Sequence, residues 1–82
     1  MNTCTNQTIL NELCNVNLAY HMNVSELLDF GVRQVASDRY VLYTLTYNGY
    51  NEPVEEDITV PINSKLMIGT LKGLATDYYS RN

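Results

Sequence analysis

Residues 39–61 constrain the fold most strongly, because two alternating segments flank a group of turn-forming residues. Strand-favouring side chains recur at every second position of the first segment, as in a strand with one buried face. One face would carry Val41, Tyr43, Leu45 and Tyr47, and the other Leu42, Thr44 and Thr46. In the second segment, Val54, Glu56, Ile58 and Val60 alternate with Glu55, Asp57 and Thr59. We therefore predict a β-hairpin.

Two registers compete in this hairpin. A two-residue Asn48-Gly49 turn is a strong hairpin signal. It would place Pro53 inside the ladder, where proline cannot donate a hydrogen bond. We predict a longer loop over residues 48–53, because it gathers the apolar side chains on one face, although it also sets an acid opposite a leucine. The predicted pairs are Tyr47 with Val54, Leu45 with Glu56, Tyr43 with Ile58 and Val41 with Val60.

The N-terminal third predicts a helix over residues 5–14, with Thr5 as its N-cap. Apolar side chains at helical spacing form its buried stripe. Residues 16–22 fit either a continuation of this helix or a short strand, because Val16, Leu18 and Tyr20 also alternate. We favour a helical structure, either as one helix or as two short helices.

A second helix is predicted over residues 23–36, where Asn23 and Glu26 form a variant of the capping box. Phe30 lies off the apolar stripe and is expected to be partly exposed. Gly31 costs about 1 kcal/mol relative to alanine in a helix interior. Residues 32–36 therefore remain open as an additional strand, followed by a turn at Ser37-Asp38.

The C-terminal segment predicts a last helix, capped by Asn63 or Ser64 and running to about Tyr79. Gly69 and Gly73 lie away from its apolar stripe. The stripe consists of Met67, Leu71, Leu74, Ala75 and Tyr78. The 82 residues thus predict a single α+β domain (1–82) of order ααββα, in which helices cover a hairpin.

Residues 19–28 resemble the turn of a helix-turn-helix, with a small residue, a hydrophobic one and then Asn-Val-Ser opening the next helix. With the hairpin and last helix, the predicted order is similar to that of a winged helix. The second helix would present Glu26, Asp29 and a single base, Arg33. Repulsion from phosphates argues against DNA reading by such a helix. A winged helix that contacts protein remains open.

The sequence has nine acidic and five basic residues, with a formal net charge of −4. This charge argues against a general nucleic-acid binder and suits a basic partner. No apolar run approaches the ~20 residues of a transmembrane helix, so we expect no membrane contact. Residues 1–10 lack the basic and apolar regions of a secretory signal. We expect a cytoplasmic protein in which Cys4 and Cys14 are reduced thiols.

No residue set predicts catalysis. A Cys14–His21 pair would share one face of a continuous helix, but no orienting group or oxyanion site accompanies it. Cys4, Cys14 and His21 match no zinc spacing. The acids between residues 52 and 57 lack the alternation and central glycine of a calcium loop. We predict neither an enzyme nor a cofactor.

The acidic run at residues 52–57 is the candidate partner-binding site. It contains four of the nine acids and is flanked by Tyr47 and Tyr50, whose side chains offer a large, rigid contact area. Charges on a solvated edge strand can also simply discourage aggregation. The predicted site residues are Tyr47, Tyr50, Glu52, Glu55, Glu56 and Asp57.

We expect a small acidic inhibitor that occludes a basic site on a larger protein, such as an enzyme that handles nucleic acid. In size and charge the chain is similar to small phage-encoded anti-defence inhibitors, anti-CRISPR proteins included, and to bacterial immunity proteins. Two alternatives remain: a winged-helix transcriptional regulator, and a small-ligand or nucleotide-binding protein whose tyrosines stack on a base. A homodimer also remains open, because a two-stranded hairpin leaves two edges to cover.

Overall fold

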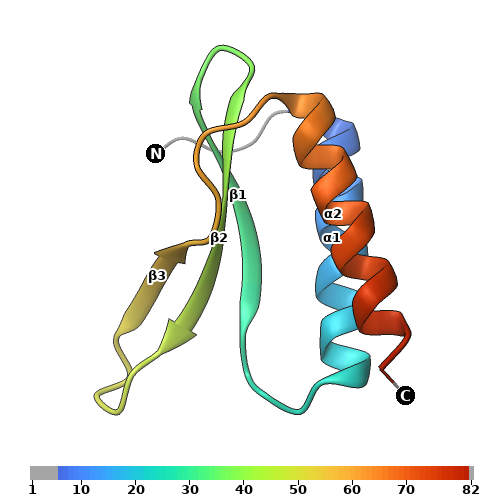
Figure 1. Ribbon diagram of the computed structural model, residues 1–82. Coiled ribbons are helices and arrows are strands. Elements are labelled where there is room, and N and C mark those ends of the chain that lie inside the picture. Colours follow the sequence, from blue (N-terminus) through green and yellow to red (C-terminus); the bar gives the residue numbers. More distant parts are fainter. Residues whose placement is uncertain (1–5, 82) are drawn as a thin grey trace.

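Two helices lie side by side against a three-stranded antiparallel sheet in the computed structural model, which describes residues 6–81 (Figure 1). The strands are in the order β1-β2-β3 across the sheet. The α+β class is confirmed, but the element order is αβββα and the predicted ααββα order is wrong. The elements are α1 (Gln7–Asn23), β1 (Asp29–Ala36), β2 (Arg39–Tyr47), β3 (Pro53–Asp57) and α2 (Ser64–Tyr79).

Helix α1 begins after Asn6, whose side-chain oxygen accepts a 3.1 Å hydrogen bond from the Ile9 amide. Asn6 is therefore the N-cap, and the predicted cap Thr5 lies outside the described residues. The helix continues without a break through residues 16–22, so the helical interpretation of this segment is confirmed in its one-helix form. Val16 and Tyr20 are buried on the same stripe as Ile9, so helical spacing rather than alternation governs this segment.

The predicted second helix is wrong, because its C-terminal half is strand β1. Residues 24–28, where the helix-turn-helix likeness begins a second helix, lead into this strand without forming a helix. Phe30 is only 7% exposed and Val32 only 6%, so the burial alternates as in a half-buried strand. The alternative prediction of a strand over residues 32–36 agrees with the structure better than the helix does, although the strand begins three residues earlier, at Asp29. The turn at Ser37-Asp38 joins β1 to β2.

The hairpin register differs by one residue from the predicted one. Tyr47 pairs with Pro53 rather than Val54, and Tyr43 pairs with Asp57 rather than Ile58. A shift of one residue moves every side chain of β3 to the opposite face. Glu55 and Asp57 therefore lie on the face of Tyr43, and Glu56 lies on the other.

The turn between β2 and β3 explains this register. The Asn51 backbone amide donates a 2.9 Å hydrogen bond to the Asn48 carbonyl, and the Asn48 backbone amide donates one of 3.0 Å to the Glu52 carbonyl. Asn51 has a φ of 61°, a left-handed backbone conformation that asparagine tolerates and that closes the short loop. Pro53 follows at a position that does not exchange ladder hydrogen bonds with β2, so its missing N–H is tolerated.

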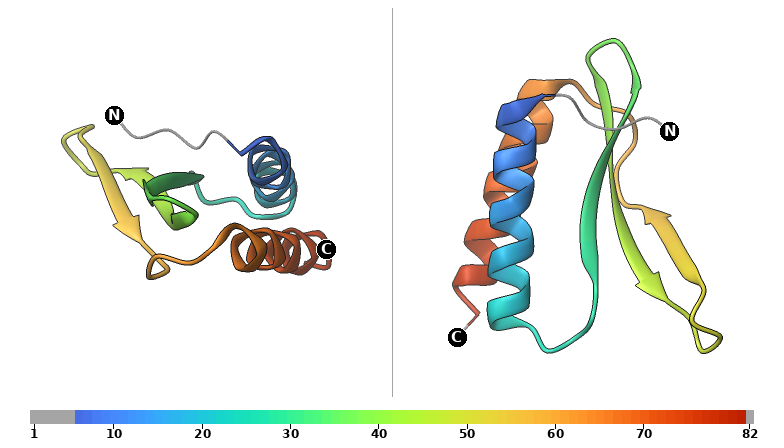
Figure 2. Two further views of the ribbon diagram at one scale, coloured as in Figure 1. Left: turned by 90° about the horizontal axis from the view of Figure 1, so that it is seen from above. Right: turned by 180° about the vertical axis from the view of Figure 1, so that it is seen from behind.

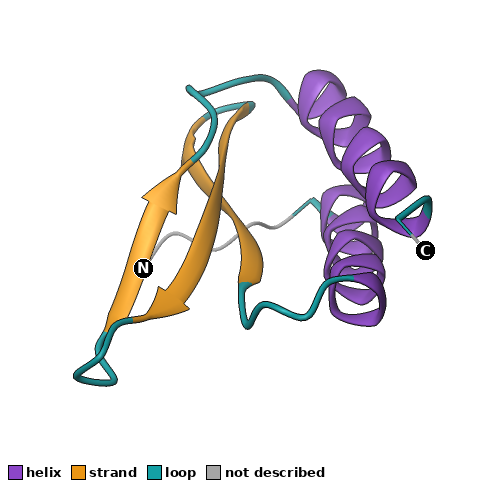
Figure 3. Ribbon diagram, turned by 60° about the horizontal axis from the view of Figure 1, so that its bottom comes forward, coloured by secondary structure: helices purple, strands orange, loops and turns teal. Residues whose placement is uncertain are grey.

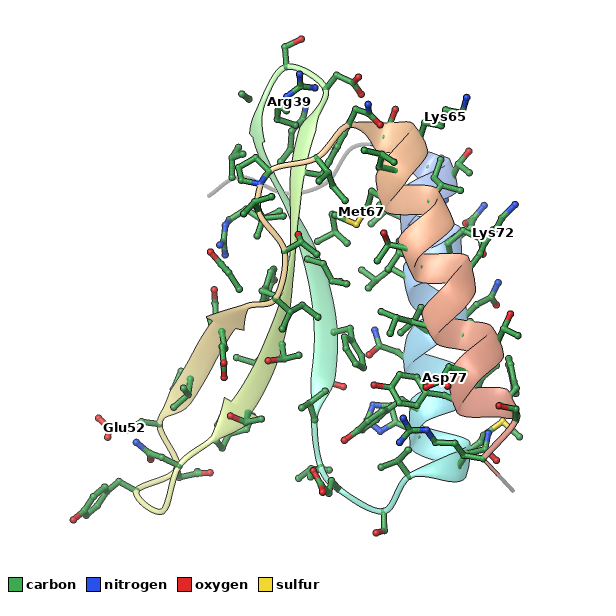
Figure 4. All side chains as sticks on the ribbon, in the orientation of Figure 1. Arg39, Glu52, Lys65, Met67, Lys72 and Asp77 are labelled. Carbon is green, nitrogen blue, oxygen red and sulfur yellow. The ribbon has the colours of Figure 1, made fainter. Side chains whose placement is uncertain are left out.

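The core lies between the helix pair and strands β1 and β2. Helix α2 begins after Asn63, one of the two predicted caps, and Met67 points from the helix towards the sheet (Figure 4). Neither helix contacts β3 in the described part of the chain, and all five β3 residues are exposed (Figure 2). The core residues are Ile9, Val16, Tyr20, Phe30, Val32, Tyr40, Leu42, Met67, Leu71 and Ala75.

One side chain of α1 closes the free edge of β1 at Phe30, near the start of the strand. The Asn17 amide nitrogen donates a 3.0 Å hydrogen bond to the Phe30 carbonyl, and its oxygen accepts one of 2.8 Å from the Phe30 amide. Asn17 thus occupies both backbone groups that an additional strand would use at this position.

We expect Asn17→Ala to lower the free energy of unfolding by about 1–3 kcal/mol, because it leaves both backbone groups of Phe30 without their partner. Urea denaturation followed by circular dichroism measures the change. Asn15→Ala is the matched control, since Asn15 is exposed on the same helix. Equal stability of the two variants would contradict a structural role for the Asn17 amide.

Candidate functional site

The end of the hairpin extends sideways, away from the helix pair (Figure 1). We call residues 46–57 the hairpin arm; they comprise the last two residues of β2, the turn and β3 (Figure 3). Tyr47 is 56% exposed and Tyr50 is 87% exposed. The arm therefore presents most of its surface to solvent while the first part of β2 is held in the core.

Tyr43 lies at the centre of the outer sheet face, the face turned away from the helices. The Arg33 guanidinium lies over its ring, 5.0 Å from the centroid, in a cation–π arrangement. Nη1 of Arg33 lies 3.1 Å from Oε1 of Glu55, and Nη2 lies 2.7 Å from Oδ1 of Asp57. One side chain of β1 thus reaches across β2 to two carboxylates of β3.

This cluster fixes the direction of two predicted site residues. The hydrogen bond to Asp57 raises the pKa of the Arg33 guanidinium above its ordinary value. The Arg33 side chain is 30% exposed, whereas Glu55 and Asp57 are 53% and 54% exposed. The two carboxylates are therefore held by Arg33 on one side and face water on the other.

The six predicted site residues lie at one end of the molecule but not on one face. Tyr47, Glu55 and Asp57 share the outer sheet face, and Glu56 lies on the opposite face. Tyr50 and Glu52 belong to the turn, where Glu52 accepts a 3.1 Å hydrogen bond from the Asn48 side chain. Figure 4 shows Glu52 at the end of the arm, far from Lys65 and Lys72 on α2.

Arg33 is the site residue that the sequence prediction did not include. The predicted helix put it on a solvated surface, without a partner in the hairpin. Once residues 29–36 are treated as a strand, Gly31 and Arg33 alternate with the buried Phe30 and Val32. That alternation is the signal that places Arg33 on the outer face, beside Tyr43.

Apolar side chains flank Glu56 on the helix-facing side of the arm. Val54 is 43% exposed and Ile58, just beyond β3, is 47% exposed. Ile58 is opposite Leu42, to whose carbonyl its amide donates a 2.9 Å hydrogen bond. Val54, Glu56 and Ile58 therefore form an apolar–acidic–apolar row beyond the covered part of the sheet.

The groups weighed for catalysis are arranged differently. His21 Nε2 lies 2.8 Å from Oδ1 of Asp29, which connects α1 to the start of β1. Cys14 is an exposed free thiol, and Cys4 lies outside the described residues. Among residues 6–81, no group of three or more His, Cys, Asp or Glu side chains could hold a metal ion.

Neither described helix is both long and apolar enough to cross a membrane. No protein-family model matches the sequence, and neither a curated protein nor a solved structure matches the chain.

Proposed function

We propose that the protein is a small protein-binding inhibitor, whose hairpin arm occupies a basic site on a larger partner and so occludes it. A site that normally holds nucleic acid is the kind of basic site this arm would fit. The observation that carries the proposal is the separation of arm and core. The arm contains two exposed tyrosines and four carboxylates, and within residues 6–81 neither helix contacts β3.

Charge supports this assignment. Glu52, Glu55, Glu56 and Asp57 lie on or beside β3, and Arg33 is the cation that contacts this group among the described ion pairs. Four carboxylates outnumber one guanidinium, so the arm remains acidic. An exposed acidic surface attracts a cationic site over about 10 Å at ordinary ionic strength and accelerates association.

Preorganisation supports it as well. A side chain that is already held in its bound geometry loses less conformational entropy on binding. Arg33 holds Glu55 and Asp57, and the turn hydrogen bonds hold the Asn48–Glu52 segment. Tyrosine has few rotatable bonds, so Tyr47 and Tyr50 add contact area at a low entropic cost.

We expect Glu52→Lys/Glu56→Lys to slow association with the partner by about tenfold or more at low salt. These two acids are suitable because neither contacts Arg33, so the cluster over Tyr43 is preserved. The partner is obtained by affinity capture from a host lysate, and the association rate is measured by surface plasmon resonance at several salt concentrations.

The matched control is Glu26→Lys/Asp77→Lys, which changes the net charge equally at two exposed residues away from the arm. This control should retain most of the wild-type rate. Equal rates for the two double variants would show that only net charge matters and would overturn the assignment of the arm. Unchanged binding by the Glu52/Glu56 variant would overturn the proposed function.

A further inference from the structure

The two edges of the sheet are treated differently. On β1, the Asn17 side chain occupies both backbone groups of Phe30. On β3, all five residues are exposed and neither helix contacts the strand in the described part of the chain. The sheet therefore has one edge that is closed at Phe30, near the start of β1, and one edge that is open along β3.

The pairing pattern identifies which backbone groups of β3 are open. The Ile58 amide donates a hydrogen bond to the Leu42 carbonyl of β2. Backbone groups alternate in direction along a strand, so Glu56 and Val54 also direct their N–H and C=O groups towards β2. Glu55 and Asp57 alternate with these residues. Their N–H and C=O groups therefore point away from the sheet, in the geometry that an additional strand would use.

We propose that the open edge of β3 accepts an extended basic segment of the partner as a fourth strand. This inference rests on the proposed function and specifies how the arm is recognised. In such β-strand addition, backbone hydrogen bonds provide affinity, while alternate side chains provide specificity. The open edge carries the proposal, and the acids determine the chemistry of its occupant.

Charge selects a partner segment over a second copy of this chain. If two β3 edges paired, Glu55, Glu56 and Asp57 of one copy would lie beside the same acids of the other, and like charges on neighbouring strands are destabilising. The β1 edge of a second copy is closed at Phe30 by Asn17. A strand that contains lysine or arginine is attracted by the acids of β3 and does not depend on the β1 edge.

The side chains of β3 also define a pattern for this strand. Basic residues would lie beside Glu55 and Asp57 on the outer face and beside Glu56 on the other. Apolar residues would lie beside Val54 and Ile58, which are 43% and 47% exposed. The preferred segment is therefore apolar, basic, basic, basic, apolar.

The peptide acetyl-Thr-Val-Lys-Lys-Lys-Val-Thr-amide tests this inference with the whole protein. Its sequence is the same in both directions, so parallel and antiparallel addition are tested together. We expect saturating peptide to slow amide hydrogen exchange at Glu55 and Asp57 by at least tenfold, as measured by NMR. The analogue with glutamate in place of lysine should produce no protection. Binding without protection of these two amides would overturn strand addition.

A pair of variants separates the backbone contribution from charge. Glu55→Thr removes the carboxylate and keeps the open N–H, whereas Glu55→Pro removes both. Pro53 already occupies an equivalent outward position, so proline at residue 55 is compatible with pairing to β2. We expect the proline variant to bind the peptide at least tenfold more weakly than the threonine variant. Retained amide shifts at Thr44 and Glu56 verify the ladder.

The outcomes distinguish this inference from the function on which it rests. Equal peptide affinity of the two Glu55 variants would overturn strand addition while leaving an electrostatic surface on the arm. Unchanged partner binding by Glu52→Lys/Glu56→Lys would overturn the proposed function itself. Protection of the Glu55 and Asp57 amides, together with selective loss in the proline variant, would support both.

Discussion

Leu42→Ala is expected to lower the free energy of unfolding by about 2–5 kcal/mol. Leu42 is completely buried on the helix-facing side of the central strand. Removal of its branched side chain loses apolar burial and leaves a cavity beside the helix pair. A domain of this length is typically stable by only about 4–12 kcal/mol, so this variant should unfold partly near body temperature.

Val54→Ala is the matched control, because it also shortens an aliphatic side chain of the sheet. Val54 is 43% exposed on β3, which neither of the two described helices contacts. Its substitution should change the free energy of unfolding by less than about 1 kcal/mol. Urea titration of both variants gives the comparison. Similar losses would mean that the arm contributes to the core, and the separation of arm and core would be wrong.

The last helix could be predicted because local and tertiary signals agree. Asn63 provides a cap, and its side chain accepts a 2.9 Å hydrogen bond from the Leu66 amide. Met67, Leu71 and Ala75 recur at intervals of four residues and are all buried. A segment in which capping and apolar spacing indicate the same structure leaves little ambiguity.

Strand β1 could not be predicted in the same way, because local and tertiary signals conflict. Asn23 and Glu26 resemble a helix start, but no helix follows. Phe30 and Val32 are buried only because β1 pairs with β2 and packs against the helices. Gly31 was the informative residue, since it is unfavourable in a helix yet suits a strand on which a ring is packed.

The register error had a direct consequence for the site. The alternation of β2 was predicted correctly, but the loop length was not, because it depends on the left-handed conformation of Asn51. With the observed loop, Glu55 and Asp57 lie on the outer face within reach of Arg33. Periodicity indicates which residues share a face, whereas turn geometry decides which face of the neighbouring strand they meet.

Strand β2 connects the two parts of the molecule. Its first half contributes Tyr40 and Leu42 to the core, and its last residue, Tyr47, belongs to the arm. Tyr43 lies between these parts, on the outer face opposite Gly31. The packing of Tyr43 on β1 therefore affects both the stability of the sheet and the position of Arg33 over the acids of β3.

Gly31→Ala is expected to lower the free energy of unfolding by about 1–3 kcal/mol. A Cβ at residue 31 would lie 2.8 Å from Cε1 of Tyr43, and closer still to Cζ, so the ring would have to move. Its movement would also disturb the Arg33 stack over the same ring. Chemical denaturation measures the loss, and NMR shifts of Tyr43 and of the Arg33 side chain report the displacement.

The same substitution elsewhere is expected to have the opposite sign. Gly73 is exposed in α2, and a Cβ there meets no atom within 4 Å, so Gly73→Ala should raise stability by about 0.5–1 kcal/mol.

Removal of the Tyr43 ring provides a second comparison, because it relieves the clash with a Cβ at residue 31. In a Tyr43→Ala background, Gly31→Ala should be neutral or stabilising, because the ring that it displaces is gone. Additive losses in the double variant would show that the contact between Gly31 and Tyr43 is not the cause.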